Sequence, residues 1–194
     1  YAAAQTQPLS LYCSNLEEQC RALASAFGRS SGIAVRMVRK STNEFLTQIR
    51  AEASNPQGDV WWGGPADAHW AAADDQLLDA YRSPAVDALY PWAKSHAEKT
   101  GFRTTGVYAG AVGIGYNSKI LAAKSIAPPR CWADLADGRF AGEVQMADPR
   151  ASGTSYLFVT MTLERLGETA GFSYLAALAK NVNQFTKSGT APVK

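Results

Sequence analysis

Short apolar runs alternate with stretches of helical periodicity along the first third of the chain. The run at residues 9–12 predicts a strand, and a second strand is predicted where Ile33, Val35 and Met37 alternate with Ala34 and Arg36. Residues 59–62 form a third short apolar run, which Gly63-Gly64-Pro65 ends. Between the first two strands, apolar residues at spacings of four, three and four mark one face of a helix: Leu16, Cys20, Leu23 and Phe27.

Local signals place the next helices. Residues 41–44 read Ser-Thr-Asn-Glu, which is the capping-box pattern, and Phe45 and Ile49 continue as an apolar stripe. The sequence at residues 69–78 predicts a further helix. The stretch from 81 to 105 shows no clear periodicity, so we expect it to be irregular or loosely helical.

The composition changes in the second half of the chain. Residues 106–116 interleave apolar with small side chains and predict a long extended crossing segment. A short helical turn is expected at 133–135 and a strand around Val144 and Met146. A helix is predicted from Tyr156 to about Leu166, and a further helix capped by Thr169.

Strands that alternate with helices of ten to fifteen residues predict an α/β fold with a largely parallel sheet. Ligands of such sheets bind beyond the carboxyl ends of the strands. The residues expected there are small or hydroxylated, and each precedes a predicted helix start, where unpaired N–H groups attract anions. They are Ser14, Ser41, Gly63, Gly64 and residues 152–155.

Composition excludes several classes of protein. The 194 residues carry 19 basic and 17 acidic side chains, a balance that argues against a dedicated nucleic-acid binder. No run of eighteen apolar residues is present, so no membrane span is expected. Three cysteines are too few for a disulfide scaffold. We expect all three to be buried free thiols, because a helix starting near Asn15 would place Cys20 beyond the roughly 7 Å Cα distance that a bridge to Cys13 allows.

No catalytic or metal template is met. The sequence has no GxSxG, Walker A, GxGxxG, CxxC or HExxH motif, and His69 has no evident partner for base catalysis. Asp59 and Asp67 could form a carboxylate pair, although Asp59 at a strand start suits a structural role. Trp61 and Trp62 point to opposite faces of a strand, so at most one can stack on a ligand, and core packing explains both. Ser41 is likewise explained by capping alone.

The order of motifs resembles the periplasmic substrate-binding proteins of bacterial ABC importers, in the branch of ferric-ion, 2-aminoethylphosphonate and hexose-phosphate receptors. The resemblance covers nearly the whole chain and rests on order and spacing. The matching pieces are Leu11-Tyr12-Cys13-Ser14, Ile49-Arg50-Ala51-Glu52-Ala53, Asp59-Val60-Trp61-Trp62-Gly63-Gly64, Gly113-Ile114-Gly115-Tyr116-Asn117, Trp132-Ala133-Asp134-Leu135, Asp148-Pro149, Ser152-Gly153-Thr154-Ser155-Tyr156 and Ser188-Gly189-Thr190-Ala191-Pro192.

The resemblance implies a type II fold of two α/β lobes around a cleft, with residues 1–105 as the first lobe and 106–194 as the crossing strand and a partial second lobe. It implies no enzyme activity, no cofactor and no metal, but an anionic small molecule, a phosphate or phosphonate, delivered to a cognate ABC permease in the inner membrane. The ligand-binding residues expected are Ser14, Ser41, Thr42, Gly63, Gly64, Ser152, Gly153, Thr154, Ser155 and Ser188.

Three alternatives stay open. A ferric-ion receptor of the same family would need ligands where Leu16 and Gly64 stand, which disfavours iron. A shortened scaffold or sensor partner would dimerise by exchange or by packing of exposed faces, because relatives continue well past Lys194. An enzyme acting on phosphate esters is the third. Residues 2–5, Ala-Ala-Ala-Gln, resemble the end of a signal peptide, so we expect a periplasmic protein whose signal peptide has been removed.

Overall fold

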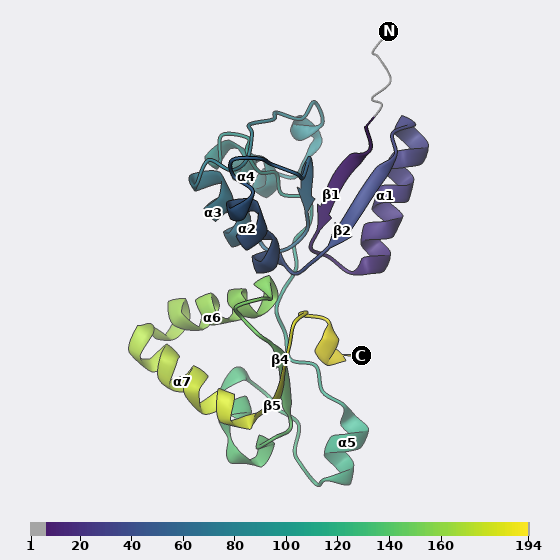
Figure 1. Cartoon of the computed structure of the whole chain (residues 1–194). Helices are drawn as coiled ribbons and strands as arrows, with labels where there is room; N and C mark the ends of the chain where they lie inside the picture. The colour runs from purple at the N-terminus through teal and green to yellow at the C-terminus, as the bar shows by residue number, and fades with distance from the viewer. Residues whose placement is uncertain (1–6, 194) are drawn as a thin grey trace. The chain divides into compact units, whose positions relative to one another are not determined.

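The chain forms two compact units in the computed structural model, which describes residues 7–193 (Figure 1). Unit 1 extends to Gly110, and unit 2 begins at Ala111. Residues 2–5, on which the signal-peptide expectation rests, lie outside the described residues. Within those described, no helix combines the length and the apolar character that crossing a membrane requires.

Unit 1 contains a parallel three-stranded sheet in the order β2-β1-β3. The strands are β1 (Leu9–Cys13), β2 (Val35–Arg39) and β3 (Val60–Trp62). Strand β2 begins at Val35, two residues later than its alternating pattern predicted. Val35 is the first residue of the ladder and pairs with Leu9, whose amide donates to the carbonyl of Ala34 just before the strand.

Four α-helices accompany this sheet. They are α1 (Glu17–Ser31), α2 (Thr42–Ala51), α3 (Ala66–Asp74) and α4 (Pro91–Lys99), with a 3₁₀ turn at Val86–Ala88. The predicted capping box at the start of α2 is present. Helix α3 begins and ends earlier than the predicted 69–78, directly after Pro65. Helix α4 lies in the stretch that had no clear periodicity, and Pro91 at its first turn suits a helix start.

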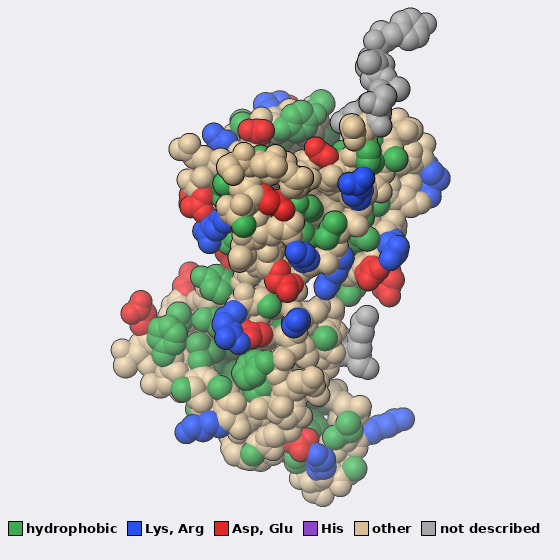
Figure 2. All heavy atoms as spheres, viewed as in Figure 1, with side chains coloured by type: hydrophobic (Ala, Val, Ile, Leu, Met, Phe, Trp, Pro, Cys, Tyr) green, Lys and Arg blue, Asp and Glu red, His purple; other side chains and the backbone are tan. Residues whose placement is uncertain are grey.

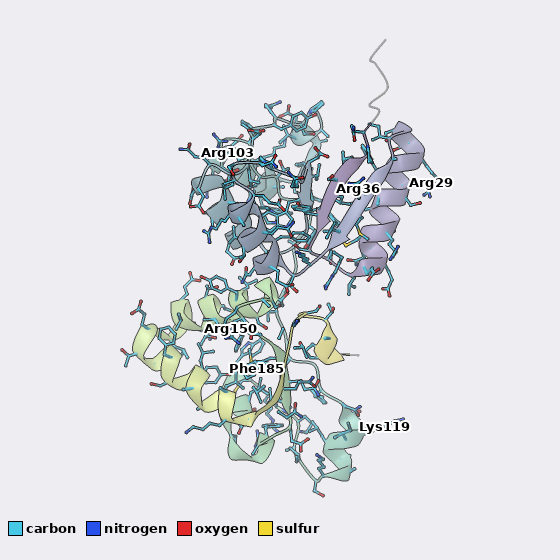
Figure 3. All side chains as sticks on the ribbon, viewed as in Figure 1. Arg29, Arg36, Arg103, Lys119, Arg150 and Phe185 are labelled. Carbon is cyan, nitrogen blue, oxygen red and sulfur yellow. A yellow bond between two sulfur atoms is a disulfide. The ribbon has the colours of Figure 1, made fainter. Side chains whose placement is uncertain are left out.

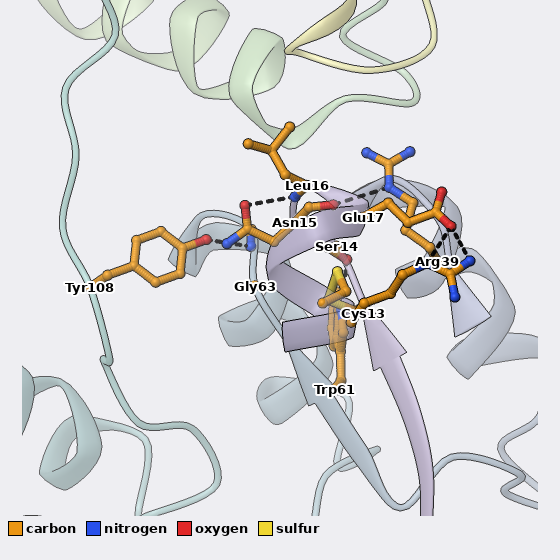
Figure 4. Close-up of a disulfide and its surroundings, with 12 residues drawn as sticks. Cys13, Ser14, Asn15, Leu16, Glu17, Arg39, Trp61, Gly63 and Tyr108 are labelled. Atoms are coloured by element: carbon orange, nitrogen blue, oxygen red, sulfur yellow. Dashed lines mark hydrogen bonds and ion pairs between the residues drawn. A yellow bond between two sulfur atoms is a disulfide. The ribbon is translucent and has the colours of Figure 1, made fainter. Parts of the chain in front are cut away.

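A disulfide joins Cys13 to Cys20, so the prediction of two free thiols is wrong (Figure 4). The tight turn at residues 14–16 brings the first turn of α1 back against the end of β1, and the Cα atoms of the two cysteines are 6.0 Å apart, within bridging distance. Both cysteines are fully buried in the core with Leu11. Cys131 is a free thiol but an exposed one, contrary to the expected burial.

The opposite face of β1 is fixed to α2 by Tyr12. The Tyr12 ring stacks on Phe45 with centroids 4.7 Å apart, and its hydroxyl donates to Glu52 at 2.8 Å and accepts from Gln48 at 3.0 Å. Burial and the hydrogen-bonded Glu52 carboxylate raise the pKa of Tyr12 to about 12. The phenol therefore stays protonated and keeps its bond to Glu52 across the physiological range.

Unit 2 is built on a parallel pair of strands, β4 (Val144–Ala147) and β5 (Val182–Thr186), with α6 (Gly153–Leu166) and α7 (Glu168–Asn181) between them in sequence. Gly167 is the N-cap of α7, so Thr169, the predicted cap, lies inside the first turn of the helix. On the face seen in Figure 2, apolar side chains gather over these two helices, where Tyr156, Leu166 and Phe172 are exposed. The remaining elements are α5 (Ser118–Ala123) and 3₁₀ turns at Trp132–Ala136, Gly138–Phe140 and Ala191–Val193.

Removing the disulfide tests its contribution to stability. A Cys13→Ala/Cys20→Ala double variant should lower the free energy of unfolding by about 2–3 kcal/mol, because the unfolded chain regains the entropy that the short closed loop denies it. Urea denaturation of oxidised wild type and variant measures the change. Cys131→Ala, which removes only the exposed free thiol, should leave stability unchanged; an equal loss in both variants would contradict this account.

Candidate functional site

The three loops that follow the strands of unit 1 meet at the carboxyl edge of its sheet. The amide of Ser14 donates to the carbonyl of Trp62 at 2.8 Å, and the amide of Lys40 donates to the carbonyl of Cys13 at 3.3 Å. Gly63 packs so closely on the first loop that an added Cβ would lie 3.2 Å from the amide nitrogen of Asn15. Parallel pairing therefore brings together the loops that carry Ser14, Ser41 and Gly63, as the sequence predicted.

Gly64 lies directly against Thr42, which is buried at the start of α2. A Cβ on Gly64 would meet the Thr42 side chain, with Cγ2 only 2.7 Å away, and the residue has φ of +91°. Both features require glycine at this position. The amide of Gly64 donates to the hydroxyl of Tyr108 at 2.8 Å, a contact that no pattern in the sequence predicts.

Several amides of this edge are already bonded within unit 1. Ser14 donates to Trp62, Ser41 donates to a carboxylate oxygen of Glu44 at 3.0 Å, and Gly64 donates to Tyr108. The prediction that these turns leave their N–H groups unpaired is therefore wrong for these three positions. The Ser14 hydroxyl is a donor that unit 1 can still offer a ligand at this edge.

The hydroxyl of Ser14 is oriented by an indole. Nε1 of Trp61 donates to Oγ of Ser14 at 3.0 Å, so the oxygen is used as an acceptor and its hydrogen is left to donate (Figure 4). The Trp61 ring stacks on His69 with centroids 3.9 Å apart, and Trp62 meets the edge of Tyr108. Both tryptophans thus pack within unit 1, and packing is the role that the sequence favoured over stacking on a ligand.

His69 supports the same edge from α3. Its Nε2 lies 2.9 Å from the carbonyl oxygen of Gly63, which can only accept, so the imidazole carries its proton on Nε2. Burial lowers the pKa of His69, an effect that the Gly63 carbonyl partly offsets, and the charge of His96 lowers it further. A neutral, hydrogen-bonded imidazole is a structural support for the Gly63-Gly64 turn and not an activated base.

The two aspartates considered as a pair have separate surroundings. Oδ2 of Asp59 accepts from the amide of Ser10 at 2.7 Å, which fixes β3 to β1 and fits the structural role expected. Oδ1 of Asp67, in the first turn of α3, is buried and has no hydrogen-bond partner among the residues described. Burial raises the pKa of Asp67, with the nearby amides of Ala68 and Asp67 acting in the opposite direction.

In unit 2, two Ser-Gly-Thr sequences follow two neighbouring parallel strands. Ser152-Gly153-Thr154 begins α6 shortly after β4, and Ser188-Gly189-Thr190 follows β5. The amide of Asp148 donates to the carbonyl of Thr186 at 2.7 Å, which joins the two strand ends. A Cβ on Gly189 would lie 2.9 Å from Thr154 Oγ1 and 3.1 Å from Ser152 Oγ, so the two Ser-Gly-Thr loops are in direct contact.

This contact leaves backbone donors available. Ser152 caps α6 by accepting from the amide of Ser155 at 3.5 Å, and both serines are buried. None of the hydrogen bonds formed among residues 7–193 takes up the amides of Gly153, Thr154 or Gly189. The positive end of a 14-residue helix adds to their attraction for an anion.

One charged pair lies beside these loops. Arg150, labelled in Figure 3, contacts both carboxylate oxygens of Asp148, and its side chain is 90% exposed. Hydrogen bonds from the Arg150 side chain and amide hold the pKa of Asp148 below its usual range. The guanidinium is thus neutralised by its neighbour in this structure. Across the described part of the chain, no group of three or more His, Cys, Asp or Glu side chains is placed to hold a metal ion.

The contact of Gly189 with Ser152 and Thr154 was not predicted from the sequence. The signal was present, because the Ser-Gly-Thr triplet at 152–154 recurs at 188–190. Two copies after two parallel strands would have placed both loops at one edge, had β5 been recognised as a strand.

Substitution of Gly64 tests the close packing on Thr42. Gly64→Ala should lower the free energy of unfolding by about 2 kcal/mol or more, because alanine disfavours positive φ and its Cβ overlaps the buried threonine. Chemical denaturation measures this change. The control is Gly110→Ala, where nothing lies within 4 Å of the added Cβ and stability should change by less than about 0.5 kcal/mol. Equal effects at the two positions would contradict the packing described.

The pH dependence of stability tests the neutral state of His69. Because the pKa of His69 is lowered in the folded protein, the unfolded state binds the proton more readily. The stability that the neutral imidazole contributes is therefore present above pH about 6.5 and is lost as the pH falls below it. Urea unfolding at pH 7.5 and 5.5 should show a loss that His69→Gln reduces and that His69→Gln/His96→Gln reduces further, since burial also lowers the pKa of His96. An unchanged loss in both variants would contradict the assignment.

Residues 66–192 match the family of bacterial extracellular solute-binding proteins. An uncharacterized protein from Haemophilus influenzae is 36% identical over 185 residues, which is 95% of this chain and 54% of that protein. A Salmonella typhimurium protein, provisionally named a 2-aminoethylphosphonate-binding periplasmic protein, is 28% identical over 84% of this chain and 45% of its own length. The chain thus spans about half the length of the curated relatives it matches.

Solved structures agree with this relationship. The periplasmic binding protein AfuA from Actinobacillus pleuropneumoniae, solved with fructose-6-phosphate bound, superposes with a TM-score of 0.92 at 35% identity, covering 97% of this chain and 59% of that one. The fold is accordingly that of the type II periplasmic binding proteins, as the resemblance implied. On the family match, the sequence identity and the shared fold together, the chain belongs to the bacterial extracellular solute-binding proteins.

Proposed function

We propose that this protein binds a small molecule bearing a phosphate or phosphonate group and serves as the extracytoplasmic binding component of an ABC importer. The observation that carries the proposal is the contact between the two Ser-Gly-Thr loops of unit 2, where the amides of Gly153, Thr154 and Gly189 have no hydrogen-bond partner within residues 7–193. Backbone N–H groups at a helix start bind anionic oxygens without a charged side chain.

The chemistry of the two loops suits a tetrahedral oxyanion. Three amides and the hydroxyl of the exposed Thr154 can each donate one hydrogen bond to a phosphate oxygen. Hydrogen bonds to a charged group contribute about 1.5–3 kcal/mol each. Three or four of them approach the roughly 8 kcal/mol of micromolar binding once the cost of association is subtracted, and contacts to the rest of the ligand supply the remainder.

We also propose Ser14, Ser41 and Thr42 of unit 1 as ligand-binding residues. They lie at the edge of its sheet, where the Ser14 hydroxyl is oriented by Trp61. AfuA was solved with fructose-6-phosphate and the Salmonella relative is named for 2-aminoethylphosphonate, so both compounds are the natural probes.

The remaining parts of the proposal follow from the family. Members deliver small ligands to an ABC permease, which supports a periplasmic location and an inner-membrane permease as the partner of this protein. The family members compared are binding proteins, so we propose binding without turnover. Leu16 and Gly64 offer no donor side chain where iron receptors would need one, which disfavours the ferric-ion alternative. A separate titration with Fe(III) tests this alternative.

Titration calorimetry with a matched pair of variants tests the site. Wild type should bind a hexose phosphate or 2-aminoethylphosphonate with micromolar affinity. Thr154→Val, which keeps the side-chain shape, should weaken binding by about tenfold to a hundredfold, as the loss of one charge-assisted hydrogen bond requires. Thr169→Val, an equally exposed threonine in the first turn of α7, is the control and should bind like wild type.

Three results would contradict the proposal. Heat on adding Fe(III) but none with the phosphorylated compounds would overturn the ligand class. Equal binding by wild type and Thr154→Val, with weakened binding by Thr169→Val, would place the site elsewhere in unit 2. Turnover of a chromogenic phosphate ester by the pure protein would argue for the enzyme alternative.

A further inference from the structure

One histidine connects three segments of unit 1. His96 lies on α4, and its two ring nitrogens contact different neighbours. Nδ1 is 3.2 Å from Nε1 of Trp70 on α3, and Nε2 is 2.7 Å from Oγ1 of Thr104 in the segment after α4. Helices α3 and α4, which lie side by side in Figure 1, are thus joined through the imidazole to the segment that leads out of unit 1.

The Trp70 contact fixes the protonation state of His96. An indole N–H can only donate, so Nδ1 of His96 accepts and carries no proton. The neutral ring then has its proton on Nε2, which donates to the hydroxyl of Thr104. That hydroxyl donates to Oγ1 of Thr100 at 3.1 Å, and Thr100 donates to the carbonyl of Ala97 at 3.1 Å. The direction of the whole chain of hydrogen bonds depends on Nδ1 being unprotonated.

Protonation of His96 would break one end of this chain and keep the other. An imidazolium donates from both nitrogens, so its Nδ1–H would face the Trp70 N–H and the bond between the two rings would be lost. The Nε2–H bond to Thr104 is compatible with both states. Thr104 is buried, whereas 41% of Trp70 is exposed. The indole can therefore turn toward water without leaving a buried polar group unpaired.

The groups on α3 do not favour a charged His96. Burial lowers the pKa of His96. Burial also lowers the pKa of His69, and the charge of His96 lowers it further, so protonation of one ring disfavours protonation of the other. Asp67 and Asp74 lie one turn to either side of Trp70. Both nitrogens of His96 are already bonded to Trp70 and Thr104, so neither carboxylate is bonded to the ring.

The groups on α4 and after it act in the same sense. Glu98 and Lys99 are both exposed. The guanidinium of Arg103 donates to the carbonyl of Leu78, in the chain after α3. His96 is therefore neutral at neutral pH and gains its proton in acid, below the ordinary histidine pKa of about 6.5.

We propose that His96 is a pH-sensitive latch, which holds Trp70 of α3 and Thr104 together at neutral pH and releases Trp70 in acid. The latch is one of two attachments of the same segment. The amide of Gly64, just before α3, donates to the hydroxyl of Tyr108, four residues after Thr104. Opening the latch leaves residues 104–108 attached to this part of unit 1 through the Gly64 bond, next to the edge of the sheet.

NMR of the ¹⁵N-labelled 194-residue chain tests the latch. At pH 7.5 the imidazole spectrum should show His96 as the Nε2–H tautomer. Lowering the pH to 5.5 should move the indole N–H resonance of Trp70 along the same titration curve as His96. His96→Gln should abolish this movement. His69→Gln, which removes the other of the two histidines, is the matched control and should leave the movement in place.

A second pair of variants tests the cause of the shift. Trp70→Phe keeps an aromatic ring but removes the N–H, so protonation of His96 no longer breaks a hydrogen bond. The midpoint of the His96 titration should rise by about half a pH unit. Trp92→Phe, which alters another partly exposed indole on α4 itself, should leave the midpoint unchanged.

Three outcomes would overturn the proposal. They are a His96 with its proton on Nδ1 at pH 7.5, a movement of the Trp70 resonance that survives His96→Gln, and equal His96 midpoints in wild type and Trp70→Phe. If a variant does not fold, the tautomer of His96 and its shared titration curve with Trp70 in the wild type decide the matter.

Discussion

Parallel pairing of neighbouring strands is the constraint on which both units depend. Because parallel strands end at the same edge, each pairing brings together two loops that are far apart in the sequence. In unit 2 the pairing of β4 with β5 brings one Ser-Gly-Thr loop against the other. In unit 1 the order β2-β1-β3 gathers the loops after all three strands. Glycines at these loops permit the close approach that larger residues would prevent.

The two sheet edges differ in how their donors are used. In unit 1 the amides of Ser14, Ser41 and Gly64 are bonded, and a disulfide and a neutral imidazole hold the surrounding loops. Unit 2 keeps backbone amides available at the start of α6. An anion is therefore expected to bind at the sheet edge of unit 2.

Local patterns predicted those features that local interactions determine. The capping box at Ser41, the strand at the start of the chain and the glycine turn at 63–64 each depend on neighbours in sequence. Strand β5 was missed because its exposed centre shows no alternation; its pairing with β4 involves residues almost forty positions away. The disulfide was missed for a similar reason. Whether Cys20 can reach Cys13 depends on the turn between them and not on their spacing. The family resemblance supplied the type II fold, which periodicity alone leaves open.

The central claim is that the amides of Gly153, Thr154 and Gly189 bind the anionic group of the ligand. Two-dimensional ¹H–¹⁵N NMR during titration with a hexose phosphate tests it most directly, because it reports each amide separately. The account predicts that these three resonances show the largest shifts and saturate together. Saturable binding that leaves all three unmoved, with the large shifts confined to other residues, would contradict it.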